Sequence, residues 1–457
     1  MPPELLNATL RPVNRATQSL TRRSFLKTLS AVGLAAPFVT RDLLALPPSS
    51  VLGHASFGAA GMAWEDLTQL ARYKRVRLLA VADVDLRRTE EVRKHFPSTR
   101  IYQDWRQLLD VEAKRLDSVN VSTPDHMHAP IAMSAMQLGK NVYCQKPLTH
   151  DLYEARKLTE FARLKGLVTQ MGIQIHSTSF YRQAALLVQA GAIGRIKEVH
   201  SWVGSCWGDT TARPDVSDPV PAGFDWNLWL GVCAERAFIG KEYYHPVNWR
   251  KRLDFGTSTI GDMACHIFDP VFMAIGLTAP ISVRSEGSPP NEWNWPVDAE
   301  VHYVFPGTPF TAEKTLPVTW YDCSRRPPPE IRALLEGDEL PGAGSIFVGS
   351  QGVLVLPHVA RAMLYPDKKF KDLKLPEVTE ENHWGKFVEA CLGGGRTTAG
   401  FNYSGPLAEA VLVGTVALRF PKTTLQWNAA ALSFAEGEAN KYIRRQYRRG
   451  WAVKGLS

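Results

Sequence analysis

From residue 51 onward, short apolar runs alternate with stretches in which apolar residues recur every three or four positions. In Asp151–Lys165, for example, Ala155, Leu158 and Ala162 share one face while charged residues occupy the other, which predicts a helix. Alternating strands and helices predict a parallel sheet with right-handed crossovers, whose ligand lies at the carboxyl ends of the strands. The predicted strands are Leu52–Phe57, Val76–Ala82, Ser118–Ser122, Asn141–Cys144 and Leu167–Met171.

The pattern changes beyond about residue 177. Strand-like runs occur at Arg195–Val203 and Val301–Phe305, and most of the tryptophans lie in this half, where we expect them mainly in cores. The segments 208–225 and 322–345 are rich in proline, glycine and charge and predict long loops. We therefore expect a second, α+β domain over residues 177–457, after a nucleotide-binding domain over 51–176.

The first fifty residues form a separate segment. Thr21-Arg22-Arg23-Ser24-Phe25-Leu26-Lys27 precedes the apolar stretch Leu29–Val39, and together they resemble a twin-arginine export signal followed by a linker. A basic amphipathic helix is the alternative. The apolar stretch is shorter than the roughly 20 residues of a membrane span, and no clear cleavage site stands out near Ala45. The expected location is the periplasm or outside the cell, with a membrane tether if the signal is retained.

Charge and cysteines narrow the possible partners. The net charge of +8 comes from the two ends of the chain, which leaves a nearly neutral body without the basic face that nucleic-acid binding requires. The arginine-rich end Arg444–Arg449 is expected to be a solvated helix face or a subunit contact. The six cysteines are far apart and form no CxxC pair, so isolated buried thiols are expected, although an exported protein would permit disulfides.

The first predicted strand runs into Gly58-Ala59-Ala60-Gly61-Met62-Ala63, where a dinucleotide-binding loop reads G-x-G-x-x-G/A. Gly58 suits the tight turn, but Ala60 stands where a second glycine normally lets the backbone approach the pyrophosphate. Asp83 ends the second predicted strand, near the position of a ribose-binding carboxylate, and favours NAD over NADP. The following Arg87 and Arg88 would suit the 2′-phosphate of NADP, or simply begin a solvated helix.

Further motifs occur in a fixed order along the chain: Ser122-Thr123-Pro124-Asp125-His126-Met127-His128, then Gln145-Lys146-Pro147, and then Gly261-Asp262-Met263-Ala264-Cys265-His266-Ile267-Phe268-Asp269. With them, residues 51–451 resemble the Gfo/Idh/MocA family of glucose-fructose oxidoreductase and inositol dehydrogenase-like enzymes. The resemblance implies an α/β Rossmann dinucleotide-binding domain plus an α+β domain with a mainly antiparallel sheet. It also implies an NAD-dependent oxidoreductase acting on a sugar or polyol, and a homo-oligomer. Export in the folded state further implies a tightly held cofactor.

The resemblance also implies roles for individual residues. Lys146 lies between the nicotinamide and the reacting hydroxyl, where an ammonium stabilises a developing alkoxide. Asp262 and His266, four apart on a predicted helix, reach the substrate, and His266 accepts the hydroxyl proton with a pKa near roughly 6.5, so the rate should rise between about pH 5.5 and 7.5. Gln145 replaces the family's common glutamate, which should either lower the pKa of Lys146 further or leave its orientation to another group. An Asp/His pair can also hold a metal, but without a third ligand at useful spacing we predict none.

The predicted site residues belong to two groups. Gln174, His176, Trp249 and Arg250 are expected to face the same cleft as the motifs. The residues predicted to bind the cofactor are Gly58, Ala59, Ala60, Gly61, Met62, Asp83, Thr123, Pro124, His128, Gln145, Lys146 and Gln174, and those predicted for the substrate are Lys146, His176, Trp249, Arg250, Asp262 and His266.

Two alternatives remain open. One is a glycoside hydrolase that oxidises a ring carbon transiently with bound NAD, eliminates the aglycone, adds water and reduces the ring again. The other is a non-catalytic sugar-binding relative, which the departures at Ala60 and Gln145 allow.

Overall fold

A computed structural model describes residues 51–457, and the predicted export signal and linker at 1–50 lie outside the described residues. Within the described part, the first sheet has six parallel strands in the order β3-β2-β1-β4-β5-β6. This is the strand order of a dinucleotide-binding Rossmann fold. The strands are β1 (Leu52–Phe57), β2 (Val76–Ala82), β3 (Arg100–Tyr102), β4 (Ser118–Val121), β5 (Asn141–Gln145) and β6 (Thr169–Gly172).

The helices of this part are α2 (Met62–Ala71), α3 (Glu90–His95), α4 (Trp105–Glu112), α5 (His128–Gln137) and α6 (Leu152–Lys165). Helix α6 shows why the sequence pattern succeeds here: Asp151 and Glu154 form a capping box at its start, and Gly166 ends it in the left-handed conformation. The five predicted strands are confirmed to within two residues. Strand β3 was not predicted, because three residues at a sheet edge carry no periodic signal.

The second sheet, also within the described residues, has nine strands in the order β13-β12-β11-β7-β10-β9-β8-β14-β15. All of its pairings are antiparallel except β7 with β10, so the predicted mainly antiparallel sheet is confirmed. The strands are β7 (Ile196–Val203), β8 (Ser282–Ser285), β9 (Glu300–Pro306), β10 (Thr315–Tyr321), β11 (Ala343–Gly349), β12 (Val353–Pro357), β13 (Met363–Tyr365), β14 (Leu425–Asn428) and β15 (Ser433–Phe434).

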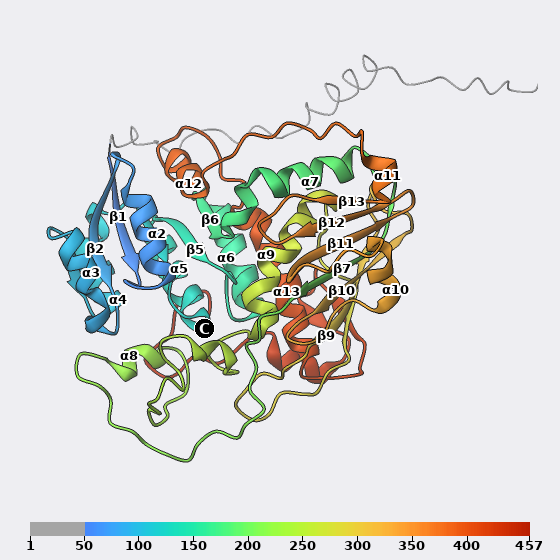
Figure 1. Cartoon of the computed structure of the whole chain (residues 1–457). Coiled ribbons are helices and arrows are strands. Elements are labelled where there is room, and N and C mark those ends of the chain that lie inside the picture. Colours follow the sequence, from blue (N-terminus) through green and yellow to red (C-terminus); the bar gives the residue numbers. More distant parts are fainter. Residues whose placement is uncertain (1–50) are drawn as a thin grey trace, which may run out of the picture. The chain divides into compact units, whose positions relative to one another are not determined.

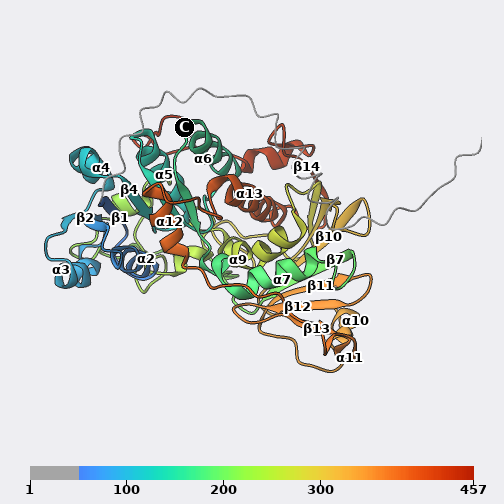
Figure 2. The same cartoon turned by 90° about the horizontal axis from the view of Figure 1, so that it is seen from above.

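Long helices connect the two sheets. Helix α13 packs on both α6 and α9, and α9 packs on α7 and on strands β7 and β11, so these helices form a layer between the sheets (Figure 1). Helix α12, which lies late in the chain, packs beside α2, a helix of the first half of the chain (Figure 2). The helices of this half are α7 (Ser179–Gln189), α8 (Trp226–Leu230), α9 (Ser258–Ile275), α10 (Pro329–Arg332), α11 (Asp367–Phe370), α12 (His383–Cys391) and α13 (Phe401–Ala417).

Three expectations need correction. The segment 322–345 is not all loop, because it contains α10 and the first residues of β11. The arginine-rich end is not a helix face: Arg445 is inserted beside Asp151, and Tyr447 donates to Glu154 at 2.6 Å. Cys206 and Cys323 are not isolated thiols but form a disulfide with a Cα–Cα distance of 4.7 Å.

The disulfide forms because parallel pairing brings the ends of β7 and β10 together, which linear spacing does not reveal. The remaining cysteines, Cys144, Cys233, Cys265 and Cys391, are free thiols. No helix among residues 51–457 is long and apolar enough to cross a membrane.

Candidate active site

A cavity of about 350 Å³ opens at the carboxyl ends of β1, β2, β4 and β5. Its size is in the range of small-molecule sites, and its walls come from both halves of the chain. Most of the predicted site residues line it. They are Gly58, Ala60, Gly61, Met62, Asp83, Thr123, Pro124, His128, Gln145, Lys146, Gln174, Trp249, Arg250 and His266.

The glycine loop is shaped as a dinucleotide-binding turn. Gly58 has a φ of 104°, and a Cβ there would lie 2.7 Å from the carbonyl oxygen of Ser122, so only glycine fits. Gly61 has a φ of 63° and is the residue before the first turn of α2, and a Cβ there would lie 3.9 Å from the guanidinium of Arg88. The loop therefore presents the amino-terminal end of α2 to the cavity, where backbone N–H groups favour an anion such as a pyrophosphate. The second flexible position has moved by one residue, from Ala60 to Gly61.

The carboxylate of Asp83 stabilises this loop through hydrogen bonds to backbone N–H groups. Its Oδ2 accepts a hydrogen bond from the backbone N–H of Ala59 at 2.9 Å, and its Oδ1 accepts one from Asp85 at 2.9 Å. Burial raises the pKa of Asp83 to about 6, against the effect of these two donors. Ala59 itself does not line the cavity and contributes through this backbone contact. Of the two following arginines, Arg88 lines the cavity, whereas Arg87 is not among its lining residues. Arg87 instead pairs with Asp85 at 2.7 Å.

A segment from the second half of the chain, residues 223–250, closes over this end of the cavity, and we call this segment the strap. The backbone of Leu86 donates to Gly223 at 2.8 Å, and that of Asp225 donates to Val84 at 2.9 Å, so the strap is hydrogen-bonded to the segment that follows β2. From there the strap supplies Leu228, Trp229, His245, Pro246, Val247, Trp249 and Arg250 to the cavity wall.

Thr123 brings a buried polar atom to the cavity lining. This atom, Oγ1, has no hydrogen-bond partner among the described residues. Such an atom is expected to be satisfied by a ligand or a water. His128, by contrast, is fully engaged in the fold: its ring nitrogens lie 2.8 Å from the carbonyl of Pro147 and 2.7 Å from that of Thr123. Burial lowers the pKa of His128 to about 4, so at neutral pH its ring donates to only one of these two carbonyls.

Lys146 is held by Asp262. Its Nζ donates to the carboxylate Oδ1 of Asp262 at 2.7 Å and to the backbone carbonyl of the same residue at 2.6 Å. An ammonium has three donors, so one remains, and Lys146 lines the cavity. Arg250 adds a second donor to Asp262 Oδ1 at 3.1 Å. Although burial opposes it, the charges of Lys146 and Arg250 hold the pKa of Asp262 far below its usual value. Asp262 lies behind the cavity wall and anchors Lys146 there.

The glutamine of the Gln-Lys-Pro motif has a carboxylate partner of its own. Gln145 Nε2 donates to Asp66 Oδ2 at 2.8 Å, and Asp66 also accepts from Ser122 and from Trp384. Burial raises the pKa of Asp66 to about 6. Gly172 leaves room for this contact, because a Cβ there would lie 2.6 Å from the amide of Gln145. Asp66 of α2 thus supplies the negative charge that the glutamine at position 145 lacks.

His266 lines the cavity beside Lys146, but not as an ordinary imidazole. Burial first, and then the charge of Lys146, lower the pKa of His266 well below 6.5. The expected rate increase between about pH 5.5 and 7.5 assumed an ordinary imidazole, and the lowered pKa of His266 shifts that increase to lower pH. Its Nδ1 is buried without a partner among the described residues, and its ring centroid lies 5.8 Å from that of His358. His358 in turn bonds the hydroxyl of Tyr181 at 2.8 Å.

His176 does not face the cavity, which corrects the expectation from its position after β6. Its Nδ1 lies 2.8 Å from Asp269 Oδ1, and Tyr403 donates to the same carboxylate oxygen at 2.7 Å. His176 and Asp269 are buried and Tyr403 is half-buried, so His176 and Asp269 connect helices rather than bind a substrate. Gln174, two residues earlier, does line the cavity and donates to Tyr143 at 3.2 Å.

Three side chains at the site were not predicted. Asp125 lines the cavity, and its position directly after a strand end was an available signal. Asp66 was detectable as a polar residue on the apolar face of α2. Trp207, whose indole donates to Asp262 at 2.8 Å, gave no local signal because it lies in a loop far along the chain. Among residues 51–457, no group of three or more His, Cys, Asp or Glu side chains could hold a metal ion.

Comparison with known proteins supports this geometry. Residues 51–173 match the model of the GFO_IDH_MocA oxidoreductase family, described as an NAD-binding Rossmann fold. Levoglucosan dehydrogenase of Pseudarthrobacter phenanthrenivorans is 25% identical over 201 residues, which cover 44% of this chain and 42% of that protein. Inositol 2-dehydrogenase 4 of Saccharopolyspora erythraea is 29% identical over 177 residues, covering 38% and 52%. The chain thus matches about half the length of these curated relatives.

The fold similarity extends further than the sequence similarity. The WlbA dehydrogenase from Bordetella pertussis, solved with NADH and UDP-GlcNAcA, matches with a TM-score of 0.59 over 83% of this chain and 99% of that one, at 12% identity. GenD2 from gentamicin A biosynthesis, solved with NAD, matches with a TM-score of 0.56 over 84% and 98%, at 17% identity. Residues 51–173 of this chain therefore match the NAD-binding Rossmann fold of the Gfo/Idh/MocA oxidoreductase family.

Proposed function

We propose that this protein transfers hydride between a carbinol of a sugar or polyol and an NAD molecule that stays bound through turnover. One observation carries the proposal: Lys146, from the end of β5, and His266, from α9, meet in the same cavity into which the glycine loop opens. The names of the levoglucosan and inositol dehydrogenases support a carbohydrate substrate.

The chain's residues fit a dinucleotide. The amino-terminal end of α2 suits the pyrophosphate, Asp83 stands where a ribose carboxylate is expected, and Thr123 Oγ1 is a buried polar atom in need of a partner. When bound, the nicotinamide would supply the acceptor or donor of the hydride.

Side chains of the protein stabilise the developing charge and accept the proton. Lys146 directs its remaining N–H at the substrate oxygen and stabilises negative charge as the carbinol is oxidised. His266, neutral above acidic pH, accepts the hydroxyl proton through its imidazole. Asp262, which also accepts a hydrogen bond from Arg250, holds Lys146 in place, and Trp249 packs against the guanidinium of Arg250, 4.3 Å from the ring centroid.

The strap supports cofactor retention. Its backbone hydrogen bonds to the segment after β2 hold it at this end of the cavity, which favours retention of a dinucleotide, and a second substrate is expected to regenerate the cofactor in place. Retention suits the proposed export through the twin-arginine route, since a folded protein would carry its cofactor out of the cytoplasm. We also propose that the protein assembles as a homo-oligomer.

The test begins with native mass spectrometry of the purified protein, which we expect to carry one dinucleotide per chain. Adding a panel of sugars and polyols should then produce reduced nicotinamide on the protein, visible by its absorbance, and Lys146→Ala should not. Release of p-nitrophenol from glycosides without net reduction would instead establish the hydrolase. Absence of both dinucleotide binding and turnover would support the alternative of a non-catalytic sugar-binding protein.

A further inference from the structure

Trp207 is the third partner of the carboxylate that anchors Lys146. Its indole Nε1 donates to Oδ2 of Asp262 at 2.8 Å, whereas Lys146 and Arg250 both donate to Oδ1. The two carboxylate oxygens are thus held by different partners, which fixes the rotation of the carboxylate. If the indole donor is lost, the Oδ1 atom is free to turn away from Lys146.

Two further contacts hold Trp207. Its backbone N–H donates to Oγ1 of Thr259 at 2.7 Å, on the first turn of α9, and the guanidinium of Arg250 lies 5.3 Å from its ring centroid. Trp207 therefore touches the helix that carries Asp262 and the turn that carries Arg250, although it lies in a segment without helix or strand.

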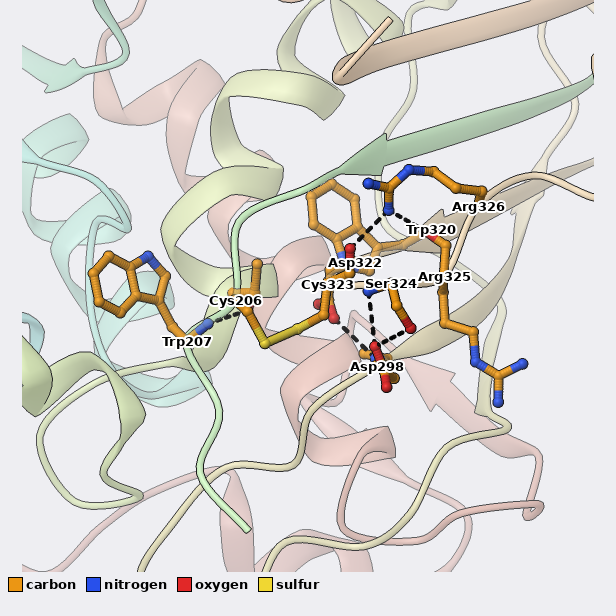
Figure 3. The surroundings of a disulfide bond; sticks show 11 residues. Cys206, Trp207, Asp298, Trp320, Asp322, Cys323, Ser324, Arg325 and Arg326 are labelled. Carbon is orange, nitrogen blue, oxygen red and sulfur yellow. Dashed lines mark hydrogen bonds between the residues drawn. A yellow bond between two sulfur atoms is a disulfide. The ribbon is translucent and has the colours of Figure 1, made fainter. Parts of the chain in front are cut away.

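The residue before Trp207 is covalently fixed. Cys206 forms the disulfide with Cys323, two residues after the end of β10, and Figure 3 shows Trp207 directly beyond this bridge. Asp322, next to Cys323, accepts from the backbone N–H of Ala299 at 2.9 Å and from the indole of Trp320 at 3.0 Å. The Cys323 end is thus anchored in the sheet, while the Cys206 end begins a long loop.

We propose that Trp207 is a positioning residue for Lys146, acting through Asp262, and that the Cys206–Cys323 disulfide must be intact for it to do so. This inference rests on the proposed function. A dithiol would reduce the bridge by transferring two electrons and two protons, giving two cysteine thiols while the dithiol becomes a disulfide. The segment would then be held by weaker contacts, such as the pair between Asp209 and Arg252 at 2.7 Å.

The first test is Trp207→Phe, which keeps an aromatic ring and removes the donor. Loss of a hydrogen bond to a charged group predicts that kcat falls about 10- to 100-fold, with little change in KM. In a double-mutant cycle with Asp262→Asn, the two losses should not add, because both act through the same carboxylate. Trp293→Phe is the matched control, since Trp293 packs on Arg213, with the guanidinium 4.8 Å from its ring centroid, and should keep wild-type kcat.

The second test removes the bridge, by Cys206→Ser with Cys323→Ser or by dithiol reduction of the folded wild type, with free thiols counted by mass spectrometry. We expect a loss of kcat of the same order as in Trp207→Phe, not additive with it, and recovered on reoxidation. Unchanged kcat with both thiols free, or in Trp207→Phe, would overturn the inference.

A readout independent of turnover separates this inference from the proposed function. Acylation of the Lys146 amine, followed by peptide mass spectrometry, should become several-fold faster in Trp207→Phe and in the bridge-free protein, but not in Trp293→Phe. Equal labelling in all forms would refute the positioning role even if no sugar is oxidised. Failure of the wild type to turn over any polyol, with the labelling differences present, would refute only the proposed function.

Discussion

Asp125 gives a prediction about stability whose size follows from its burial. The side chain is 3% exposed, lines the cavity, and accepts a hydrogen bond from Thr257 Oγ1 at 2.7 Å. Burial raises the pKa of Asp125 from 3.8 to about 7, more than the Thr257 bond and nearby cations lower it. The unfolded chain therefore ionises this carboxyl at lower pH than the folded protein does.

The sign follows from linkage. A carboxyl whose folded pKa is raised binds more protons in the folded state, so stability falls as pH rises from about 4 to 7. At 1.36 kcal/mol per pKa unit, the difference between the unfolded pKa of 3.8 and the folded pKa of about 7 destabilises the folded protein by roughly 4 kcal/mol at pH 8. Asp125→Asn keeps an oxygen for the Thr257 bond and removes the titration, so it should stabilise the protein by up to that amount at pH 8, by ~1.5 kcal/mol at pH 5, and hardly at all below pH 4.

Thermal melting of the cofactor-free protein measures this. An unfolding entropy of ~2.1 cal/mol/K per residue over about 400 residues makes 4 kcal/mol worth ~5 °C, so Asp125→Asn should melt ~5 °C higher at pH 8 and ~2 °C higher at pH 5. Asp298→Asn is the control of opposite sign, because the bonds from Ser324 lower the pKa of Asp298. A gain for Asp125→Asn that is the same at both pH values, or a loss at pH 8, would refute the reasoning.

The remaining predictions concern the site. Lys146→Ala should lower turnover at least ~100-fold with an unchanged circular dichroism spectrum, and wild-type rates would remove Lys146 from the mechanism. Because burial and Lys146 lower the pKa of His266, the wild-type rate should fall only at pH values well below 6.5, and His266→Asn should abolish that limb of the pH profile. Gln145→Glu places a second carboxylate against Asp66 and should cost ~10-fold in kcat/KM, which Asp66→Asn in the same chain should restore. Arg88→Ala should weaken NADP binding ~10-fold in fluorescence titrations and NAD binding much less, and equal losses would exclude a 2′-phosphate contact.

The sequence by itself determined the elements and their order. Alternating apolar runs predicted strands such as Val76–Ala82 with the bounds that the structure shows, and the predicted helix holding Asp262 and His266 is part of α9. The glycine loop and the Lys146 motif were readable for the same reason. Each depends on residues close together in the chain, and local periodicity and turn chemistry carry such information.

Only the tertiary structure decided which distant side chains act together. Pairing of β7 with β10 turned two unremarkable cysteines into a bridge, and the approach of α2 to β5 gave Gln145 its carboxylate at Asp66. The same folding turned His176 inward to Asp269, although its place after β6 suggested the cleft. Contacts between residues tens to hundreds of positions apart depend on how elements pack, and burial then sets the pKa values of His266 and Asp125, which no local pattern encodes.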